Sequence, residues 1–117
     1  MSSTPGSSEG AIQMDVERNA RAQVLYREVN DHIRELDEAF QSHGRVAVLC
    51  ECGRGCAERL QVPVHEYDRA RREPTYFLVA TPHIAREVDR VIEDHGSWLL
   101  VEATGVAAEV ARGSYAP

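Results

Sequence analysis

The sequence lacks several features that would place it in a well-defined class of proteins. No apolar run approaches the ~20 residues of a membrane-spanning helix, and Met1-Ser-Ser-Thr-Pro has neither the basic start nor the apolar core of a signal peptide. An excess of basic residues is also missing, since the net charge is −6 and the pI is near 5.3. These absences predict a cytoplasmic protein with no membrane contact. They argue against a general nucleic-acid binder, which needs a basic face.

Several catalytic signatures are missing as well. The chain has no glycine-rich phosphate loop and no serine-histidine constellation. It also lacks the paired motifs of zinc deaminases and the CxxC of dithiol oxidoreductases. Glu93 and Asp94 are acidic neighbours without a visible partner in a cleft, and the basic cluster Arg69, Arg71 and Arg72 is typical of a solvated helix end. We therefore expect a protein that is not an enzyme.

What the chain does have is three cysteines within seven residues, at positions 50–56. The approach through 46–50 is strand-like, and a strand places Cys50 and Cys52 on the same face. Two glycines then allow a sharp turn that brings Cys56 back toward them. Three converging thiolates are typical of a metal site that needs a fourth ligand, and zinc (Zn2+) is the usual occupant of a sulfur-rich tetrahedral site. The alternatives are inert thiols that fill a core and redox chemistry.

The best candidate for the fourth ligand is His83. It follows the most β-prone run of the chain, Thr75–Ala80, which we expect to be a central strand ending beside the cysteines. His95, in a polar turn, is the main rival. Glu51 is a weaker rival, because strand alternation points it away from the two cysteines that flank it. The predicted metal site is therefore Cys50, Cys52, Cys56 and His83.

The N-terminal third of the chain predicts a tail and a long helix. Residues 1–10 are rich in serine and glycine and are expected to be disordered. The segment 11–44 carries a helical pattern from about Asp15 to Ser42, closed by Gly44. Its apolar residues recur at three- and four-residue steps and predict one stripe toward the core: Ala22, Leu25, Val29, Ile33, Leu36 and Phe40.

A helix of this length exceeds what a small domain can cover. About 28 residues span ~42 Å, so the first turns, through Met14 and Val16, either pair with another chain or form a solvated start. We expect a protein partner whose identity the sequence does not give. A homodimer through the N-terminal helix is one form of it.

The remainder, 45–112, predicts a zinc-stapled α+β domain with a frayed tail at 113–117. A return strand over 59–62 pairs with 46–52 across the metal loop, and a short helix covers 64–72. Residues 87–93 and 98–102 favour a hairpin, although the first of these segments also fits helical spacing. A last short helix covers 105–112. The predicted fold class is α+β, a long N-terminal helix packed on a small, mostly antiparallel sheet with a zinc-knuckle hairpin.

Several groups of residues also carry a family resemblance: 29–40, Cys50-Glu-Cys-Gly-x-x-Cys-x-Glu-Arg, 65–71, Phe77-x-Val79-Ala80-x-x-His83 and 101–102. Over about 24–112 the chain resembles a family of small, uncharacterised proteins common in actinobacteria. In that family a Gly-His pair follows the phenylalanine strand, where this chain has Pro82-His83. The resemblance implies the fold and the metal site, and it brings no established activity with it.

The function predicted from these observations is a non-enzymatic interaction or regulatory module with a structural zinc. Four protein ligands close the coordination shell and leave no position for a catalytic water. The alternative is a thiol redox or zinc-responsive switch, in which Cys50, Cys52 and Cys56 lose the metal on oxidation.

Overall fold

The computed structural model describes residues 5–39, 44–56, 58–83 and 89–113, with side chains of the first helix described from Asp15 to Asp37. Within these described ranges, three helices, one short 3-10 turn and five strands follow one another. They are α1 (Pro5–Ala39), β1 (Arg45–Leu49), β2 (Arg59–Pro63), α2 (Val64–Ala70), β3 (Tyr76–Ala80), η1 (Thr81–His83), β4 (Asp89–Asp94), β5 (Trp98–Ala103) and α3 (Gly105–Gly113). The predicted α+β class, with a long N-terminal helix packed on small antiparallel sheets, is confirmed.

The strands form two sheets, whereas the sequence predicted one. β1 and β2 make a two-stranded ribbon, and β3, β5 and β4 make a three-stranded sheet in that order, with all pairs antiparallel. The central strand of the larger sheet is therefore β5, not β3 as predicted, because the β4–β5 hairpin places β5 between its two neighbours. β3 is nevertheless buried from Phe77 to Ala80. The segment after β1 lies against its other edge, where Glu51 N–H donates to the Leu78 carbonyl.

The local pairings follow the predicted pattern. β1 pairs with β2 across the cysteine loop, and β4 pairs with β5 as the predicted hairpin, with an irregularity between Val91 and Glu93. The first residues of that predicted hairpin, 87–88, lie outside the described part of the chain. β1 ends at Leu49 instead of residue 52. The Cys50 N–H still donates to the Glu58 carbonyl opposite it, but the Glu51 N–H turns to the Leu78 carbonyl of β3. The short helix ends at Ala70, two residues before its predicted end.

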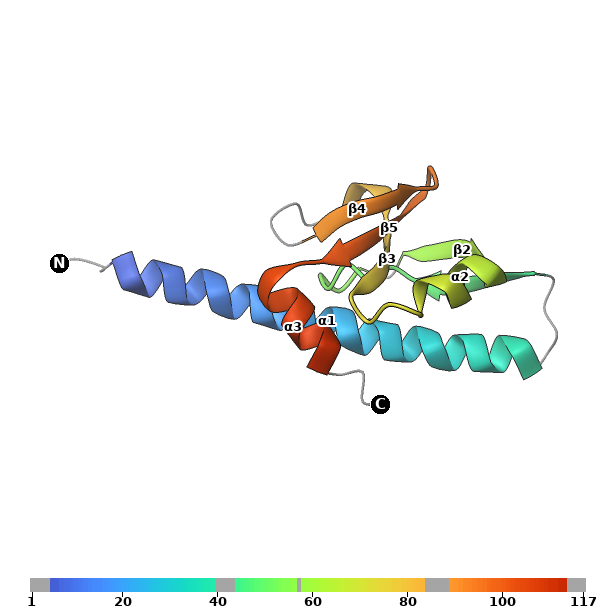
Figure 1. Cartoon of the computed structure of the whole chain (residues 1–117), viewed down its shortest axis with the longest axis horizontal. Helices are drawn as coiled ribbons and strands as arrows, with labels where there is room; N and C mark the ends of the chain where they lie inside the picture. The colour runs from blue at the N-terminus through green and yellow to red at the C-terminus, as the bar shows by residue number, and fades with distance from the viewer. Residues whose placement is uncertain (1–4, 40–43, 57, 84–88, 114–117) are drawn as a thin grey trace.

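α1 is longer than predicted, because it starts at Pro5 and not near Asp15. Residues 5–10, which we expected to belong to a disordered tail, are helical, and proline is compatible with a first helical turn. The 35 residues of α1 correspond to about 52 Å. Figure 1 shows its N-terminal turns extending beyond the body of the fold, while its C-terminal half runs along β1 and α3 crosses it. Gly44 has the positive φ (81°) expected just past a helix end.

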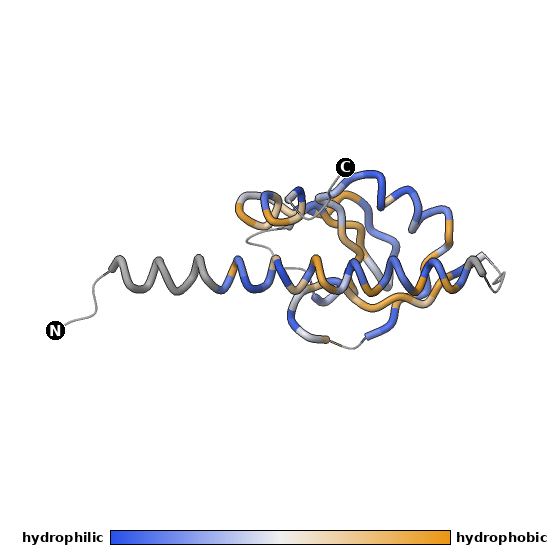
Figure 2. Tube along the Cα trace, turned by 90° about the horizontal axis from the view of Figure 1, so that it is seen from below, coloured by the Kyte–Doolittle hydropathy of each residue, from blue (hydrophilic) through white to orange (hydrophobic). Residues whose placement is uncertain are grey.

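The apolar stripe predicted for α1 faces the core only in part. Ile33 packs against the core and Ala22 is half-buried, while Phe40 lies outside the described residues. The other three members point outward. Leu25, Val29 and Leu36 are 56%, 39% and 61% exposed. Figure 2, which views the molecule from below with α1 in front, shows hydrophobic segments recurring along the helix. The buried face is instead partly polar and consists of Ala20, Gln23, Val24, Arg27 and Asn30. Two polar side chains of this face are held inward by hydrogen bonds to distant backbone carbonyls, Arg27 to Pro74 and Ala111 and Asn30 to Leu49. Hydrophobic periodicity does not register such bonds.

The core lies between the two sheets and this inner face of α1. Valine, leucine and phenylalanine side chains from both sheets fill it, among them Val48, Val62, Phe77 and Leu100. The buried alanines of α3 meet α1, since small side chains let two helices approach closely. The core thus leaves the ends of β1 and β3 side by side, and the cysteine loop sits there.

Candidate metal centre

The four residues predicted as ligands lie together. The sulfur atoms of Cys50, Cys52 and Cys56 and a ring nitrogen of His83 are all within 4.8 Å of one another. Cys50 and Cys52 are buried, and Cys56 and His83 are half-buried. Residues 33 positions apart therefore meet at a candidate metal site with one side toward solvent.

The distances suit a tetrahedral ion. Cys50 Sγ lies 3.5 Å from His83 Nδ1. A tetrahedral centre with metal–sulfur bonds of about 2.3 Å and metal–nitrogen bonds of about 2.0–2.1 Å separates two such ligands by roughly 3.6 Å. This pair already has the spacing of two ligands on one ion. The nitrogen that faces the sulfur is Nδ1, so Nδ1 is the ring atom placed to bind.

Local structure explains how the ligands converge. β3 ends at Ala80, and the η1 turn immediately places His83 beside the cysteine loop. In that loop Gly53 and Gly55 have φ values of 79° and 75°, a backbone conformation that side chains disfavour. A Cβ on Gly53 would lie only 2.5 Å from the Asn19 carbonyl oxygen, whereas one on Gly55 would meet nothing within 4 Å. The loop is thus turned by two glycines and seated on α1 at one of them.

Burial governs the protonation of the innermost thiol. Loss of solvent raises the pKa of Cys50, and a hydrogen bond from Ala80 N–H, 3.2 Å from the sulfur, opposes this only in part. The nearby Cys52 raises the pKa further. Without a metal, Cys50 is therefore a neutral thiol at neutral pH. An ion that binds here has to displace that proton, because thiolate is the ligand form of cysteine.

Glu51 is not a ligand but has a defined place that the sequence did not reveal. Its side chain is fully buried and is not part of the group of potential ligands formed by the cysteines and His83. The carboxylate accepts hydrogen bonds from Leu78 N–H (2.9 Å) and Asn30 Nδ2 (2.7 Å), and it forms an ion pair with Arg71. The only sequence signal was the position of an acidic residue between two cysteines.

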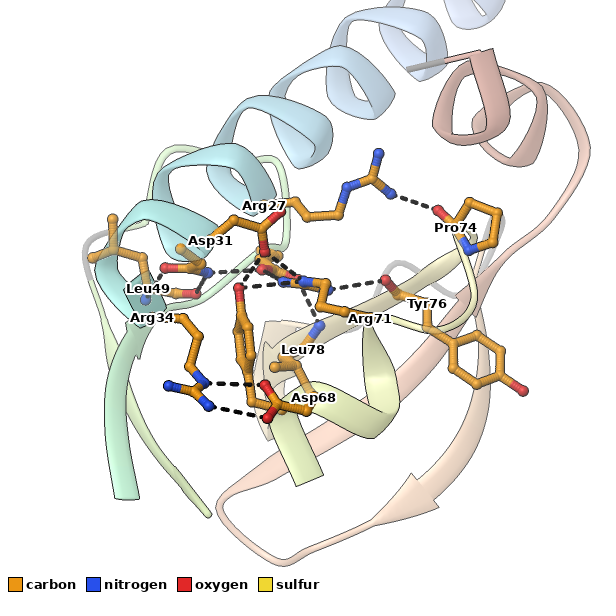
Figure 3. Close-up of polar contacts among 12 residues, drawn as sticks. Arg27, Asp31, Arg34, Leu49, Asp68, Arg71, Pro74, Tyr76 and Leu78 are labelled. Carbon is orange, nitrogen blue, oxygen red and sulfur yellow. Dashed lines mark hydrogen bonds and ion pairs between the residues drawn. The ribbon is translucent and has the colours of Figure 1, made fainter. Parts of the chain in front are cut away.

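The prediction that Arg71 belongs to a solvated helix end is wrong. Its side chain is 11% exposed, and its Nε donates to Asp31 at 3.0 Å. The guanidinium also stacks on Tyr67, 4.6 Å from the ring centre, and donates to the Tyr76 carbonyl. Burial works to lower the pKa of Arg71, but Glu51 and the other acidic neighbours outweigh it and hold the pKa above its ordinary value. Figure 3 shows Arg71 in the middle of these contacts, between α1 and the β3 segment.

The other histidines stand apart from the cysteines. His95 stacks on Trp98, with ring centres 3.9 Å apart, and its Nε2 lies 2.9 Å from Glu93. His95, Glu93 and Glu66 form a second group of potential metal ligands, but Arg69 already forms ion pairs with both carboxylates. His32 and His65 are exposed, and His43 lies outside the described residues. The rivals of His83 are therefore not brought to the site within the described part of the chain.

Comparison with protein-family models, with curated proteins and with solved structures finds no match to this chain. The resemblance to the actinobacterial family accordingly stays a prediction. Among the described helices, none combines the length and the apolar character needed to cross a membrane.

Proposed function

We propose that the chain is a small interaction module stapled by one zinc ion and that it is not an enzyme. The observation that carries the proposal is the convergence of three sulfurs and one imidazole nitrogen within 4.8 Å. Zinc favours such a sulfur-rich tetrahedral set, and four protein ligands leave it no open position for a substrate or water. A staple is useful here because a domain of 117 residues buries only a modest core.

The first experiment is elemental analysis of the purified full chain, paired with a thiol count before and after chelation. We expect about one zinc per chain and three thiols that become reactive only when the metal is removed. A chain that stays metal-free with zinc supplied during expression contradicts the proposal. An iron signature would redirect it toward electron transfer.

The interaction surface in this proposal is the outer face of α1. Ala22, Leu25, Val29, His32 and Leu36 follow one another at alternating steps of three and four residues. This is the spacing of a coiled-coil seam, which fits another helix. Leu25, Val29 and Leu36 are the exposed apolar members of this seam.

We propose a second copy of the chain as the occupant. The exposed Arg21 and Glu35 flank the seam, each seven residues from Glu28. A two-fold axis beside Glu28 brings Arg21 of each copy next to Glu35 of the other. An antiparallel pair of identical helices thus gains two opposite-charge contacts against one like-charge contact between the two Glu28 side chains. A helix from a different protein would fit the seam equally well only if it carried apolar and charged residues in the same arrangement.

Light scattering after size-exclusion chromatography tests the dimer. We expect wild type to be a dimer and the double variant Leu25→Ser/Leu36→Ser to be a monomer. The control is Val91→Ser, which removes another exposed apolar side chain on β4 and should leave the dimer intact. A monomeric wild type at the highest attainable concentration overturns the second-copy proposal and leaves the zinc staple standing.

A second candidate function, a thiol redox switch, rests on the exposure of Cys56. Its sulfur lies within 4.8 Å of that of Cys52 and on the open side of the site. With hydrogen peroxide as oxidant, Cys56 thiolate would attack one oxygen, giving a sulfenic acid and hydroxide. Cys52 thiolate would then displace a second hydroxide to form a disulfide, and zinc would lose two ligands.

Measuring zinc release in dilute peroxide distinguishes a redox switch from a structural zinc staple. Fast release that a thiol reductant reverses favours the switch, whereas release only on unfolding leaves the staple alone. For either function we propose a cytoplasmic location, because free thiols persist in a reducing compartment.

A further inference from the structure

The backbone on both sides of Cys50 is hydrogen-bonded to residues from distant parts of the chain. On the far side, Glu51 occupies the edge of β3 as a single-residue substitute for a strand. Its N–H donates to the Leu78 carbonyl at 2.8 Å, and its carboxylate accepts from Leu78 N–H at 2.9 Å. Glu51 thus satisfies both backbone groups of Leu78. The residues before and after Glu51 are Cys50 and Cys52 of the candidate metal site.

On the near side, Asn30 does the same for Leu49. Its Nδ2 donates to the Leu49 carbonyl and its Oδ1 accepts from Leu49 N–H, both at 2.8 Å. The same Nδ2 also donates to Glu51 at 2.7 Å. One buried amide of α1 therefore fixes the residue before Cys50 and the residue after it.

Arg71 makes this arrangement electrostatically stable. A carboxylate that is completely buried is very costly without a cation, and the Arg71 guanidinium is paired with Glu51. Arg71 is itself held by Asp31 of α1 and by the Tyr76 carbonyl at the start of β3 (Figure 3). Asp31 of α1 and the segment from Arg71 to Tyr76 thus meet Glu51 behind the cysteine loop.

A purely stabilising role does not account for the choice of residues. Replacing a buried ion pair with well-packed apolar side chains is often neutral or stabilising. Here, however, the Glu51 oxygens accept from a backbone N–H and a side-chain amide, which no hydrocarbon can do. The polar cluster fixes the position of a backbone segment, and that segment carries two of the four candidate ligands.

We propose that Glu51, Arg71 and Asn30 are positioning residues that hold Cys50 and Cys52 in their metal-binding geometry before the ion arrives and thereby set the affinity for zinc. This inference rests on the proposed zinc site. Partners outside the coordination shell that orient ligands typically contribute about 10–100-fold to metal affinity. We assign that size of effect to the Glu51–Arg71 pair, although neither residue touches the ion.

The test is a competition titration of the full chain against a chromogenic zinc chelator. Glu51→Gln keeps the shape of the side chain and removes its charge, and Arg71→Lys keeps the charge and removes the planar fork. The control is Arg34→Met, because Arg34 also joins α1 to α2, through a two-bond contact with Asp68 at 3.0 and 3.1 Å that involves neither Glu51 nor Arg71. Melting of the metal-free protein is measured for every variant, so that affinity and stability are separated.

We expect the dissociation constant for zinc to rise about tenfold or more in both Glu51→Gln and Arg71→Lys. Arg34→Met should lower the melting temperature without changing the affinity. Cobalt-substituted protein adds a second measure, because its visible absorption bands should shift in the two site variants and not in the control.

Two results would overturn the inference, and they are distinguishable. If wild type binds no metal, the proposed zinc site fails and the positioning role fails with it. If wild type binds zinc and either folded site variant retains an affinity within twofold of wild type and an unchanged cobalt spectrum, only the positioning role is wrong. If Glu51→Gln is too unstable to titrate, Arg71→Lys alone still tests the positioning role.

Discussion

Gly53 in the cysteine loop lies against the Asn19 carbonyl of α1 so closely that a methyl group on its Cα would come within 2.5 Å of the oxygen. The same methyl group would be 2.9 Å from Gln23 Cγ, also on α1. The close approach explains how a loop of small and polar residues stays docked on a helix. It also makes the glycine indispensable for a steric reason in addition to its positive φ.

We predict that Gly53→Ala destabilises the fold by about 2–4 kcal/mol, because a left-handed residue costs about 1–2 kcal/mol and the contact with a backbone oxygen adds to it. Gly55→Ala is the matched control. It has nearly the same φ of 75° and open space around it, so only the conformational cost of about 1–2 kcal/mol applies. Chemical denaturation of both variants measures the difference, and equal losses would show that the loop is not seated on α1.

His83→Ala should abolish tight zinc binding, whereas His95→Ala should leave it intact. The ring of His83 is 3.5 Å from the Cys50 sulfur, while His95 is stacked on Trp98. Removing a ligand should weaken zinc binding by more than the ~10–100-fold associated with outer-shell partners. Competition titration of the two variants gives the answer. Metal retention by His83→Ala equal to that of wild type would remove His83 from the site.

Chelation of the metal should lower the melting temperature reversibly. A ligand that binds only the folded state stabilises it by about 4 kcal/mol at a thousandfold excess over its dissociation constant. We therefore expect a strong chelator to lower the melting temperature by several degrees and added zinc to restore it. The Cys56→Ser variant should show a smaller difference between the two conditions. An unchanged melting curve after complete metal removal contradicts the staple.

A pH-dependent contribution should come from Glu93 on β4. Its pKa is lowered chiefly by the hydrogen bond from Arg69 and further by the one from His95. A carboxyl whose pKa is lower in the folded state stabilises the fold at pH values above its ordinary pKa, near 4.3, and this contribution disappears as pH falls through the folded pKa.

Glu93→Gln should therefore lower stability at pH 7 by at most about 1 kcal/mol, because the pair is partly exposed, and should have little effect near pH 2. Unfolding free energies at the two pH values test this. The double variant Glu93→Gln/Arg69→Met should lose less than the sum of the two single variants, because both single variants break the Arg69–Glu93 pair, although Arg69→Met also removes the pair with Glu66. A loss at pH 2 as large as that at pH 7 would attribute the effect to packing.

The elements that the sequence predicted well are those specified by neighbouring residues. The β4–β5 hairpin follows from two strand-like runs around a polar, glycine-bearing turn, and the β1–β2 pairing follows from the loop that joins them. The proximity of Cys50 and Cys52 could be predicted from their two-residue spacing, although both lie just beyond the end of β1. His83 required only that β3 end at the same edge as the cysteine loop.

The orientation of α1 could not be obtained in this way. Hydrophobic spacing selects the stripe through Leu25 and Val29, but burial follows Arg27 and Asn30. Arg27 donates to the Pro74 and Ala111 carbonyls, 47 and 84 residues away, and Asn30 bonds Leu49. These partners become visible only once the chain is folded. The same reason hid Glu51 and Arg71, which are 20 residues apart and look like ordinary surface charges.

The bond between Glu51 and Leu78 N–H has a consequence for hydrogen exchange. In a regular sheet an amide proton is protected by a strand, so it exchanges only when that strand separates. The Leu78 amide is protected instead by a side chain of the cysteine loop. Its exchange rate should therefore follow the opening of that loop, while the amides of β5 report the opening of the three-stranded sheet. One proton in the interior of the protein thus serves as a natural probe of whether the loop is closed.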